Sequence, residues 1–203
     1  MVLKEVFCGN RLAGLWKTRR PRSFQTVSAA SAGSGHLCPI LTFARYNVGV
    51  AFVIREFKAE DFDMLWRMDQ ECFPPGIAYS KAELKAYVRH RGSFTLVAES
   101  GAASGNEAAA AAGFIVAHGG PAGHVITIDV IPSARRSGVG SLLLLAAEER
   151  LRAAGSRAVG LETAVDNLAA LKFYKRHGYN VIRTWPRYYP NGVDALVMKK
   201  ELT

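Results

Sequence analysis

Cysteines are few in this chain, and their arrangement indicates neither a disulfide framework nor a zinc site. Cys8, Cys38 and Cys72 lie far apart in the 203 residues, and no C-x-x-C or H-x-x-x-H spacing occurs. No run of 18 apolar residues occurs either, so the sequence lacks the pattern of a membrane-spanning helix. We therefore expect a protein of a reducing compartment, the cytoplasm, that binds no metal and no membrane.

Acidic residues are nearly absent from the first 50 positions. Glu5 is the one acid there, against seven basic residues (Lys4, Arg11, Lys17, Arg19, Arg20, Arg22 and Arg45) in a chain of net charge +9. The remainder is only mildly basic, which does not favour nucleic-acid binding. We expect residues 1–50 to be a basic, disordered extension and residues 51–203 to form one domain. This extension fits three interpretations: a transit peptide, a disordered basic tail, or a start codon assigned upstream of the true one.

The hydrophobic pattern of residues 51–203 predicts a mixed α/β fold. Apolar runs indicate strands at 51–57, 94–99, 111–117, 124–131, 158–163, 181–185 and 195–199. Helical periodicity indicates helices at 62–72, 80–91, 139–154 and 167–177, the second opened by a capping box of Ser80 and Glu83. The order β-αα-βββ-α-β-α-ββ is not a regular βαβ alternation, so we expect a mixed sheet rather than a parallel one.

The turn between the strand at 124–131 and the helix that starts at Val139 has the features of a phosphate-binding loop. It reads Arg135-Arg136-Ser137-Gly138-Val139-Gly140. Successive backbone N–H groups at a helix N-terminus can converge on one anion, the helix dipole favours negative charge, and glycine allows close approach. Taken alone, the glycines fit a tight turn equally well, and the arginines fit solvated surface charges.

This loop resembles the acetyl-CoA signature Arg/Gln-x-x-Gly-x-Gly/Ala of the GNAT superfamily of N-acetyltransferases, in register from Arg135. A second block, Leu161–Tyr179, is similar to the Leu-Glu-Val…Asn…Ala…Leu-Tyr…Gly-Phe segment of protein N-terminal acetyltransferases, most clearly that of the ribosomal-protein alanine group. A third block, Arg187–Met198, resembles the Tyr-Tyr…Asp-Ala…Met ending of that group. The blocks occur in the family's order, and the resemblance covers Val53 to Leu202.

The resemblance implies the GNAT fold, a mixed and mostly antiparallel central sheet flanked by helices. It also implies acetyl transfer from acetyl-CoA to an amine, here the N-terminal α-amine of a protein, with ribosomal proteins among the candidates. Glu162 would be the general base and Tyr174 the general acid, while Tyr188 and Tyr189 would grip the substrate. The positions implied to bind the cofactor are Ile128, Asp129, Val130, Arg135, Arg136, Ser137, Gly138, Val139, Gly140, Ser141 and Asn167.

The chemistry agrees with an α-amine acceptor. An α-amine has a pKa near 8, so about one in ten is neutral at pH 7, whereas a lysine with a pKa near 10.4 is rarely neutral. Thr163 and Ala164 replace the Val-Arg that usually follows the glutamate, close to the expected substrate cleft. A small-molecule amine and a non-catalytic acyl-CoA-binding module remain alternatives. We expect a monomer or weak dimer, and we interpret His118, His124 and His177 as structural or exposed.

Overall fold

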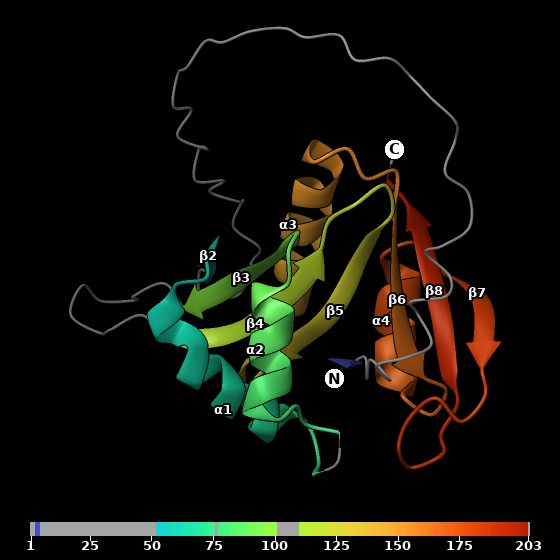
Figure 1. Ribbon diagram of the computed structural model, residues 1–203, viewed down its shortest axis with the longest axis horizontal. Helices are drawn as coiled ribbons and strands as arrows, with labels where there is room; N and C mark the ends of the chain where they lie inside the picture. Colours follow the sequence, from blue (N-terminus) through green and yellow to red (C-terminus); the bar gives the residue numbers. More distant parts are fainter. Residues whose placement is uncertain (1–2, 5–51, 76, 101–109, 203) are drawn as a thin grey trace, which may run out of the picture. The chain divides into compact units, whose positions relative to one another are not determined.

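The computed structural model describes residues 3–4, 52–75, 77–100 and 110–202, which belong to one compact unit (Figure 1). Leu3–Lys4 forms a short strand, β1, that no sequence pattern indicated. The other residues of the predicted extension lie outside the described residues, as does the connection at 101–109. The division at residue 51 and the disorder of residues 1–50 therefore stay predictions.

The predicted fold class is confirmed. The elements are β2 (Phe52–Glu56), η2 (Ala59–Asp61), α1 (Phe62–Cys72), α2 (Lys81–Arg89), β3 (Ser93–Ser100), β4 (Ala111–His118), β5 (Gly123–Val130), η3 (Pro132–Ala134), α3 (Val139–Ala153), β6 (Ala158–Ala164), α4 (Leu168–Arg176), β7 (Asn180–Trp185) and β8 (Ala195–Glu201). The sheet order is β2-β3-β4-β5-β6-β8-β7, with β1 on β5. Among the described strands, only β5 and β6 pair in parallel.

Local signals fix the helix ends. The Ser80 side chain accepts the Glu83 N–H and the Glu83 carboxylate accepts the Ser80 N–H, which completes the predicted capping box at the start of α2. Asn167 caps α4, because its side-chain oxygen accepts the Ala170 N–H at 3.1 Å. Gly155 follows α3 with a φ of 86°, the left-handed conformation that commonly ends helices.

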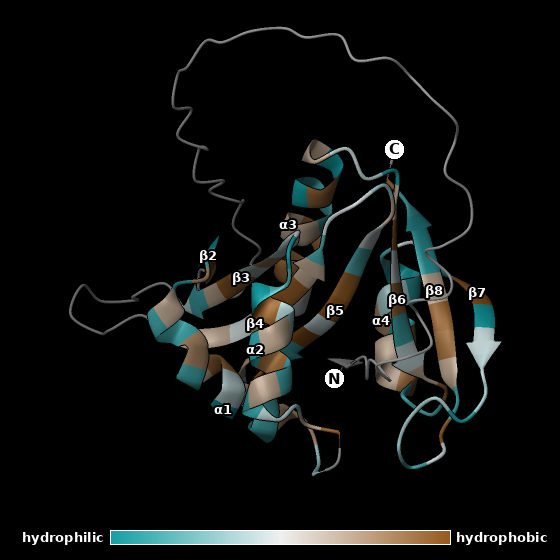
Figure 2. Cartoon of the chain, in the orientation of Figure 1, coloured by the Kyte–Doolittle hydropathy of each residue, from teal (hydrophilic) through white to brown (hydrophobic). Residues whose placement is uncertain are grey.

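Two hydrophobic cores cover opposite faces of the sheet. On β3, Val97 belongs to the core under α1 and α2, whereas its neighbours Leu96 and Ala98 belong to the core under α3 and α4. The same alternation on β4 places Ile115 under α3 and α4. A strand that is buried on both faces needs apolar residues at nearly every position, and Figure 2 shows β4 and β5 coloured accordingly.

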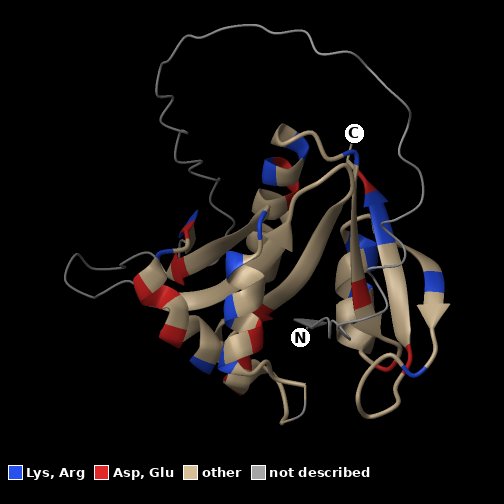
Figure 3. Ribbon diagram, in the orientation of Figure 1, with Lys and Arg blue, Asp and Glu red and all other residues tan. Residues whose placement is uncertain are grey.

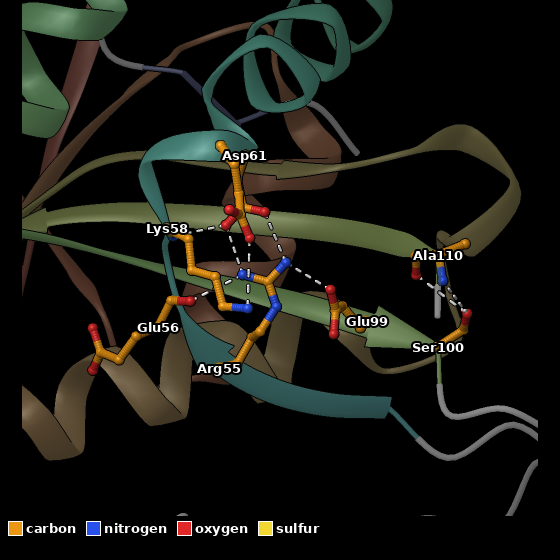
Figure 4. Close-up of polar contacts among 8 residues, drawn as sticks. Arg55, Glu56, Lys58, Asp61, Glu99, Ser100 and Ala110 are labelled. Atoms are coloured by element: carbon orange, nitrogen blue, oxygen red, sulfur yellow. Dashed lines mark hydrogen bonds and ion pairs between the residues drawn. The ribbon is translucent and has the colours of Figure 1, made fainter. Parts of the chain in front are cut away.

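An ion-pair cluster ties β2 to η2 and β3 (Figure 4). The Arg55 guanidinium donates to both carboxylate oxygens of Asp61, at 2.6 and 2.9 Å, and to Glu99 at 2.6 Å. Asp61 also accepts the Lys58 N–H at 2.7 Å. The hydrogen bonds from Arg55 lower the pKa of Asp61 below its usual value. The cluster fixes the point at which the chain leaves β2 for α1.

A charged residue of α3 is buried and paired with a residue of a distant strand. Glu148 has only 2% of its surface exposed. Lys200 of β8 donates to Glu148 Oε2 at 2.6 Å. A buried carboxylate requires such a partner, and this one lies 52 residues away in sequence.

Candidate active site

The predicted phosphate-binding loop has the backbone conformation of an anion cradle. After β5 and η3, Arg136 has a φ of 64° and Gly138 a φ of 95°, so two residues with left-handed φ values lie in the turn before α3 begins. Leu142 N to Gly138 O is the first hydrogen bond of the helix. The N–H groups of Val139, Gly140 and Ser141 precede that bond, so they have no acceptor within the helix. Such a set of donors fits a diphosphate.

The arginine and serine side chains of this loop have different tasks. Arg135 Nε donates to the Val130 carbonyl at 3.0 Å, and Ser137 Oγ donates to the Ala134 carbonyl at 2.6 Å. These bonds hold the turn against the end of β5. Arg136 is exposed beside them. The main chain therefore provides the convergent donors of the cradle, and Arg136 is the loop cation that faces solvent.

Strands β5 and β6 pair briefly and then separate. Their parallel register includes only two residue pairs, Gly123 with Val159 and His124 with Gly160. Beyond that point the edge of β5 that faces β6 pairs with β1, Ile128 opposite Leu3 and Thr127 opposite Lys4. Ile128 is one of the positions that the family resemblance implies to bind the cofactor, so β1 occupies part of the edge predicted for it.

A β-bulge on β5 sets the side-chain pattern next to this gap. Val116 lies opposite Thr127 and Ala117 opposite Val125, so Ile126 has no counterpart on β4. Val125 and Ile128 belong to the core under α3, and Ile126 to the core under α1 and α2. Thr127 hydrogen-bonds Asp129 at 2.6 Å within the strand. Main-chain groups of β5 thus line the gap, while buried side chains fix the strand from both faces.

Glu162, the predicted general base, lies beside His124, which the sequence indicates to be structural or exposed. His124 Nε2 is 3.3 Å from Glu162 Oε2, and 3% of the glutamate side chain is exposed. Val159 and Leu161 of β6 point into the core under α3 and α4, so Glu162 faces the α1–α2 side. The two groups are 38 positions apart in sequence and meet only because β5 and β6 pair. No motif spacing could have revealed this pair.

Tyr174, the predicted general acid, lies on the opposite face of β6. It is 2% exposed on α4 and belongs to the core under α3 and α4. Its ring centroid lies 5.4 Å from those of Phe173 and Tyr179, which fix its orientation. The predicted base and the predicted acid therefore lie on opposite faces of β6, and their roles stay predictions.

Tyr188 and Tyr189 lie in the connection between β7 and β8. The Tyr188 ring contacts Trp185 and Tyr189, with centroids 5.4 and 5.2 Å apart. Tyr189 is buried, and its N–H donates to the Val193 carbonyl at 3.0 Å. The tyrosines therefore form a rigid aromatic corner, and their contact with a substrate stays a prediction.

The connection between α1 and α2 is held by side chains of α1 that the sequence analysis had not singled out. Asp69, fully buried, accepts the Tyr79 N–H at 2.7 Å. Trp66 and Gln70 donate to the Tyr79 carbonyl at 3.1 and 2.9 Å. This connection lies on the same face of the sheet as Glu162, and its backbone is fixed at Tyr79. Only three-dimensional contacts reveal this, because no local signal marks Asp69 as a clamp.

Nothing in the described ranges adds a metal or a membrane segment. No group of three or more His, Cys, Asp or Glu side chains that could hold a metal occurs among residues 3–4, 52–75, 77–100 and 110–202. Within the same ranges, no helix is long and apolar enough to cross a bilayer.

Residues 62–179 match the family model described as "Acetyltransferase (GNAT) family". The chain belongs to the GNAT acetyltransferase family. An N-alpha-acetyltransferase of Sulfurisphaera tokodaii is 35% identical over 81 residues, which is 39% of this chain and 48% of that protein. N-alpha-acetyltransferase 30 of Schizosaccharomyces pombe is 34% identical over 73 residues, 36% of this chain and 49% of that protein. The matches thus span about half the length of these GNAT relatives.

Solved structures agree with this assignment. Ard1 from Thermoplasma volcanium is 28% identical, with a TM-score of 0.66 over 76% of this chain and 99% of that one. The ribosomal-protein-S18-alanine N-acetyltransferase of Escherichia coli has a TM-score of 0.64 over 75% of this chain and 94% of that one; at 20% identity it supports the fold. The GNAT cradle, the separation of β5 and β6 and the Glu162–His124 pair thus belong to one acetyltransferase domain.

Proposed function

We propose that this GNAT domain transfers acetyl from acetyl-CoA to the N-terminal α-amine of a protein, with ribosomal proteins among the candidate acceptors. The observation that carries the proposal is the arrangement around β6, where Glu162 and His124 lie on one face and Tyr174 on the other. Relatives named N-alpha-acetyltransferase support the acceptor class. The free, buried thiol of Cys72 fits a reducing compartment, and we propose the cytoplasm.

The α3 cradle would hold the diphosphate of acetyl-CoA through the N–H groups of residues 136–141, and β5 would hold the pantetheine arm along Ile128–Val130. Asn167, at the start of α4, would contact the cofactor from the other side. Acetyl-CoA supplies an activated thioester, and the amine attacks its carbonyl carbon. Main-chain N–H groups near Val130 can polarise that carbonyl, because the pairing of β5 with β4 holds them as fixed donors.

Glu162 accepts a proton from the attacking amine, and His124 stabilises the carboxylate and relays the proton to solvent. The C–N bond forms as the C–S bond breaks, and the leaving sulfur takes the proton of Tyr174, whose hydroxyl has an ordinary pKa of about 10. Tyr174 recovers a proton from solvent after product release. No covalent enzyme intermediate is required. An α-amine demands less of Glu162 than a lysine, because more of it is neutral at pH 7.

The test is acetylation of a peptide library with varied N-terminal residues, analysed by mass spectrometry beside a panel of small amines. We expect acetylated peptide N-termini and a preference at the first residues. Glu162→Gln should lower kcat/KM about 10²-fold or more, because it removes the base but keeps the shape. Glu149→Gln, on the exposed face of α3, is the matched control and should act like the native protein. Unmodified peptides beside an acetylated small amine would overturn the acceptor class.

A further inference from the structure

His177 connects the end of α4 to the first turn of α3. Its Nε2 lies 3.0 Å from Ser141 Oγ, within hydrogen-bond distance. Ser141 is the third residue of α3, and its N–H is one of the first-turn donors of the cradle. Side chains at this position lean toward the N-terminus of their helix, which directs the hydroxyl toward the proposed diphosphate site. The hydroxyl of Ser141 therefore lies between a titratable ring and that site.

The imidazole is held firmly in this position. The rings of His177 and Phe173 have centroids 4.6 Å apart. The His177 N–H donates to the carbonyls of Phe173 and Tyr174, at 3.2 and 3.0 Å, so the backbone is fixed as well. The ring thus contacts the cradle from the same helix that carries Tyr174, and a change in its protonation acts on a fixed geometry.

Charged groups of three elements surround the ring. Arg176 of α4 and Lys200 of β8 disfavour a second positive charge, whereas Glu148 of α3 favours one. Figure 3 shows Lys and Arg on α4 and β8. Burial is the largest effect, and it lowers the pKa of His177 below its usual value, so the ring is neutral at pH 7 in the free protein.

We propose that His177 is a positioning residue of the cradle that orients the Ser141 hydroxyl and takes up a proton when a diphosphate binds there. The inference rests on the proposed use of the cradle. A protonated imidazole has hydrogens on both ring nitrogens, so Ser141 Oγ must accept from it and can point its own hydrogen at the phosphate. The added charge also attracts the anion. Both effects strengthen binding when His177 is protonated.

The direction of the pH dependence follows from linkage. A bound diphosphate favours the charged ring, so it raises the pKa of His177, and the protonated ring raises the affinity equally. The extra affinity is fully present below the lowered pKa of the free protein and is lost as pH rises through the higher pKa of the complex. Between these two values, binding is accompanied by net proton uptake.

The experiment uses dephospho-CoA as the probe, because it keeps the diphosphate but lacks the 3′-phosphate, whose second pKa of about 6 would titrate in the same range. Calorimetry in buffers of different ionisation enthalpy measures proton uptake near pH 6.5. We expect uptake by the native protein, and an affinity that falls about fivefold from pH 6 to pH 8. With only five histidines in the chain, the NMR titration of His177 can be assigned by substitution and should shift upward on binding.

His177→Gln should bind the probe without proton uptake and with little pH dependence. His118→Gln is the matched control. Burial also lowers the pKa of His118, but this histidine is at the end of β4 and its Nε2 contacts the Arg91 carbonyl at 3.2 Å instead of the cradle. This control should take up protons like the native protein. Ser141→Ala should weaken binding, and Ser141→Thr should restore it, because threonine keeps the hydroxyl.

The two proposals fail in different ways. Binding of the probe by the native protein with no proton uptake, or with equal uptake in His177→Gln, would overturn the role of His177. Absence of binding at every pH, in the native protein and in all variants, would instead overturn the proposed use of the cradle.

Discussion

At the scale of single residues, Glu162 of β6, His124 of β5 and Tyr174 of α4 are the three side chains proposed to move protons in the reaction. The roles of Glu162 and Tyr174 are implied by one continuous block that resembles a known family, and they stay predictions. A role for His124 could not be predicted, since this residue reaches Glu162 only through the short β5–β6 pairing. It was interpreted as structural or exposed, and its contact with Glu162 is the observation on which its proposed role rests.

Tyr174→Phe tests the acid role at this scale. We expect kcat to fall about 10²-fold, because the leaving sulfur loses its proton donor. The KM for acetyl-CoA should change little, since the ring and its packing remain. Steady-state kinetics with a peptide acceptor provide the measurement.

Tyr179→Phe is the paired control for that substitution. It removes a hydroxyl from a buried ring whose centroid lies 5.4 Å from that of Tyr174. We expect nearly native kcat. Equal losses in the two variants would assign the effect to packing rather than to proton transfer.

At the scale of elements, the helix ends could be predicted because caps are local, whereas the burial of Glu148 could not. The Ser80–Glu83 box and the Asn167 cap involve residues three positions apart. Glu148 is buried against Lys200 of β8, which no pattern within α3 could indicate. The separation of β5 and β6 is likewise a property of the sheet. It depends on which strands pair, not on the composition of either one.

Gly138→Ala tests whether the turn into α3 is a binding feature or only a turn. Gly138 and Gly155 flank the same helix with φ values of 95° and 86°, and a Cβ on either would meet nothing within 4 Å. Each alanine substitution should therefore lower the free energy of unfolding by about 1–2 kcal/mol, through backbone strain alone. Only Gly138→Ala should also weaken acetyl-CoA binding in calorimetry. Equal affinities of the two variants for acetyl-CoA would show that the loop before α3 is only a turn and does not bind the cofactor.

The Arg55 cluster predicts a pH-dependent contribution to stability. Asp61→Asn should lower the free energy of unfolding by about 2 kcal/mol at pH 7, because it removes a bidentate, largely buried ion pair. The pKa of Asp61 is lowered in the folded state, so its contribution is present above its usual pKa and is lost as pH falls through the lowered one. Urea unfolding at pH 7 and near pH 3 should show the difference shrink.

Asp63→Asn is the control for the cluster, since it removes an exposed carboxylate that pairs with Lys81 on the surface. It should leave the unfolding curve unchanged within error. A difference between Asp61→Asn and the native protein that persists undiminished at low pH would contradict the ion-pair explanation.

At the scale of the whole molecule, the two faces of the sheet have different tasks. The α3–α4 face carries the cradle and Tyr174, and the α1–α2 face carries Glu162, His124 and the clamped connection at Tyr79. In the proposed reaction, the acetyl donor and the amine would therefore reach β6 from opposite faces of the sheet.

The strand β1 adds a prediction at this scale. Because it pairs with Thr127 and Ile128 on the edge proposed for the pantetheine arm, acetyl-CoA must displace it. A chain that lacks residues 1–50 has no β1–β5 hydrogen bonds to break when the cofactor binds. If one net hydrogen bond is saved, acetyl-CoA should bind more tightly by about 1 kcal/mol, which is about fivefold in Kd. Calorimetry on both forms measures this. Weaker binding by the shortened chain would show that the segment supports the site instead.

The most direct test of the central claim uses one peptide that contains both a free α-amine and a lysine. After incubation with acetyl-CoA at pH 7, fragmentation mass spectrometry locates the added acetyl group. We predict acetylation of the α-nitrogen, with a rate lowered about 10²-fold or more in Glu162→Gln and unchanged in Glu149→Gln. Acetyl on the lysine, or an unmodified peptide where a small amine is acetylated under the same conditions, would contradict this prediction.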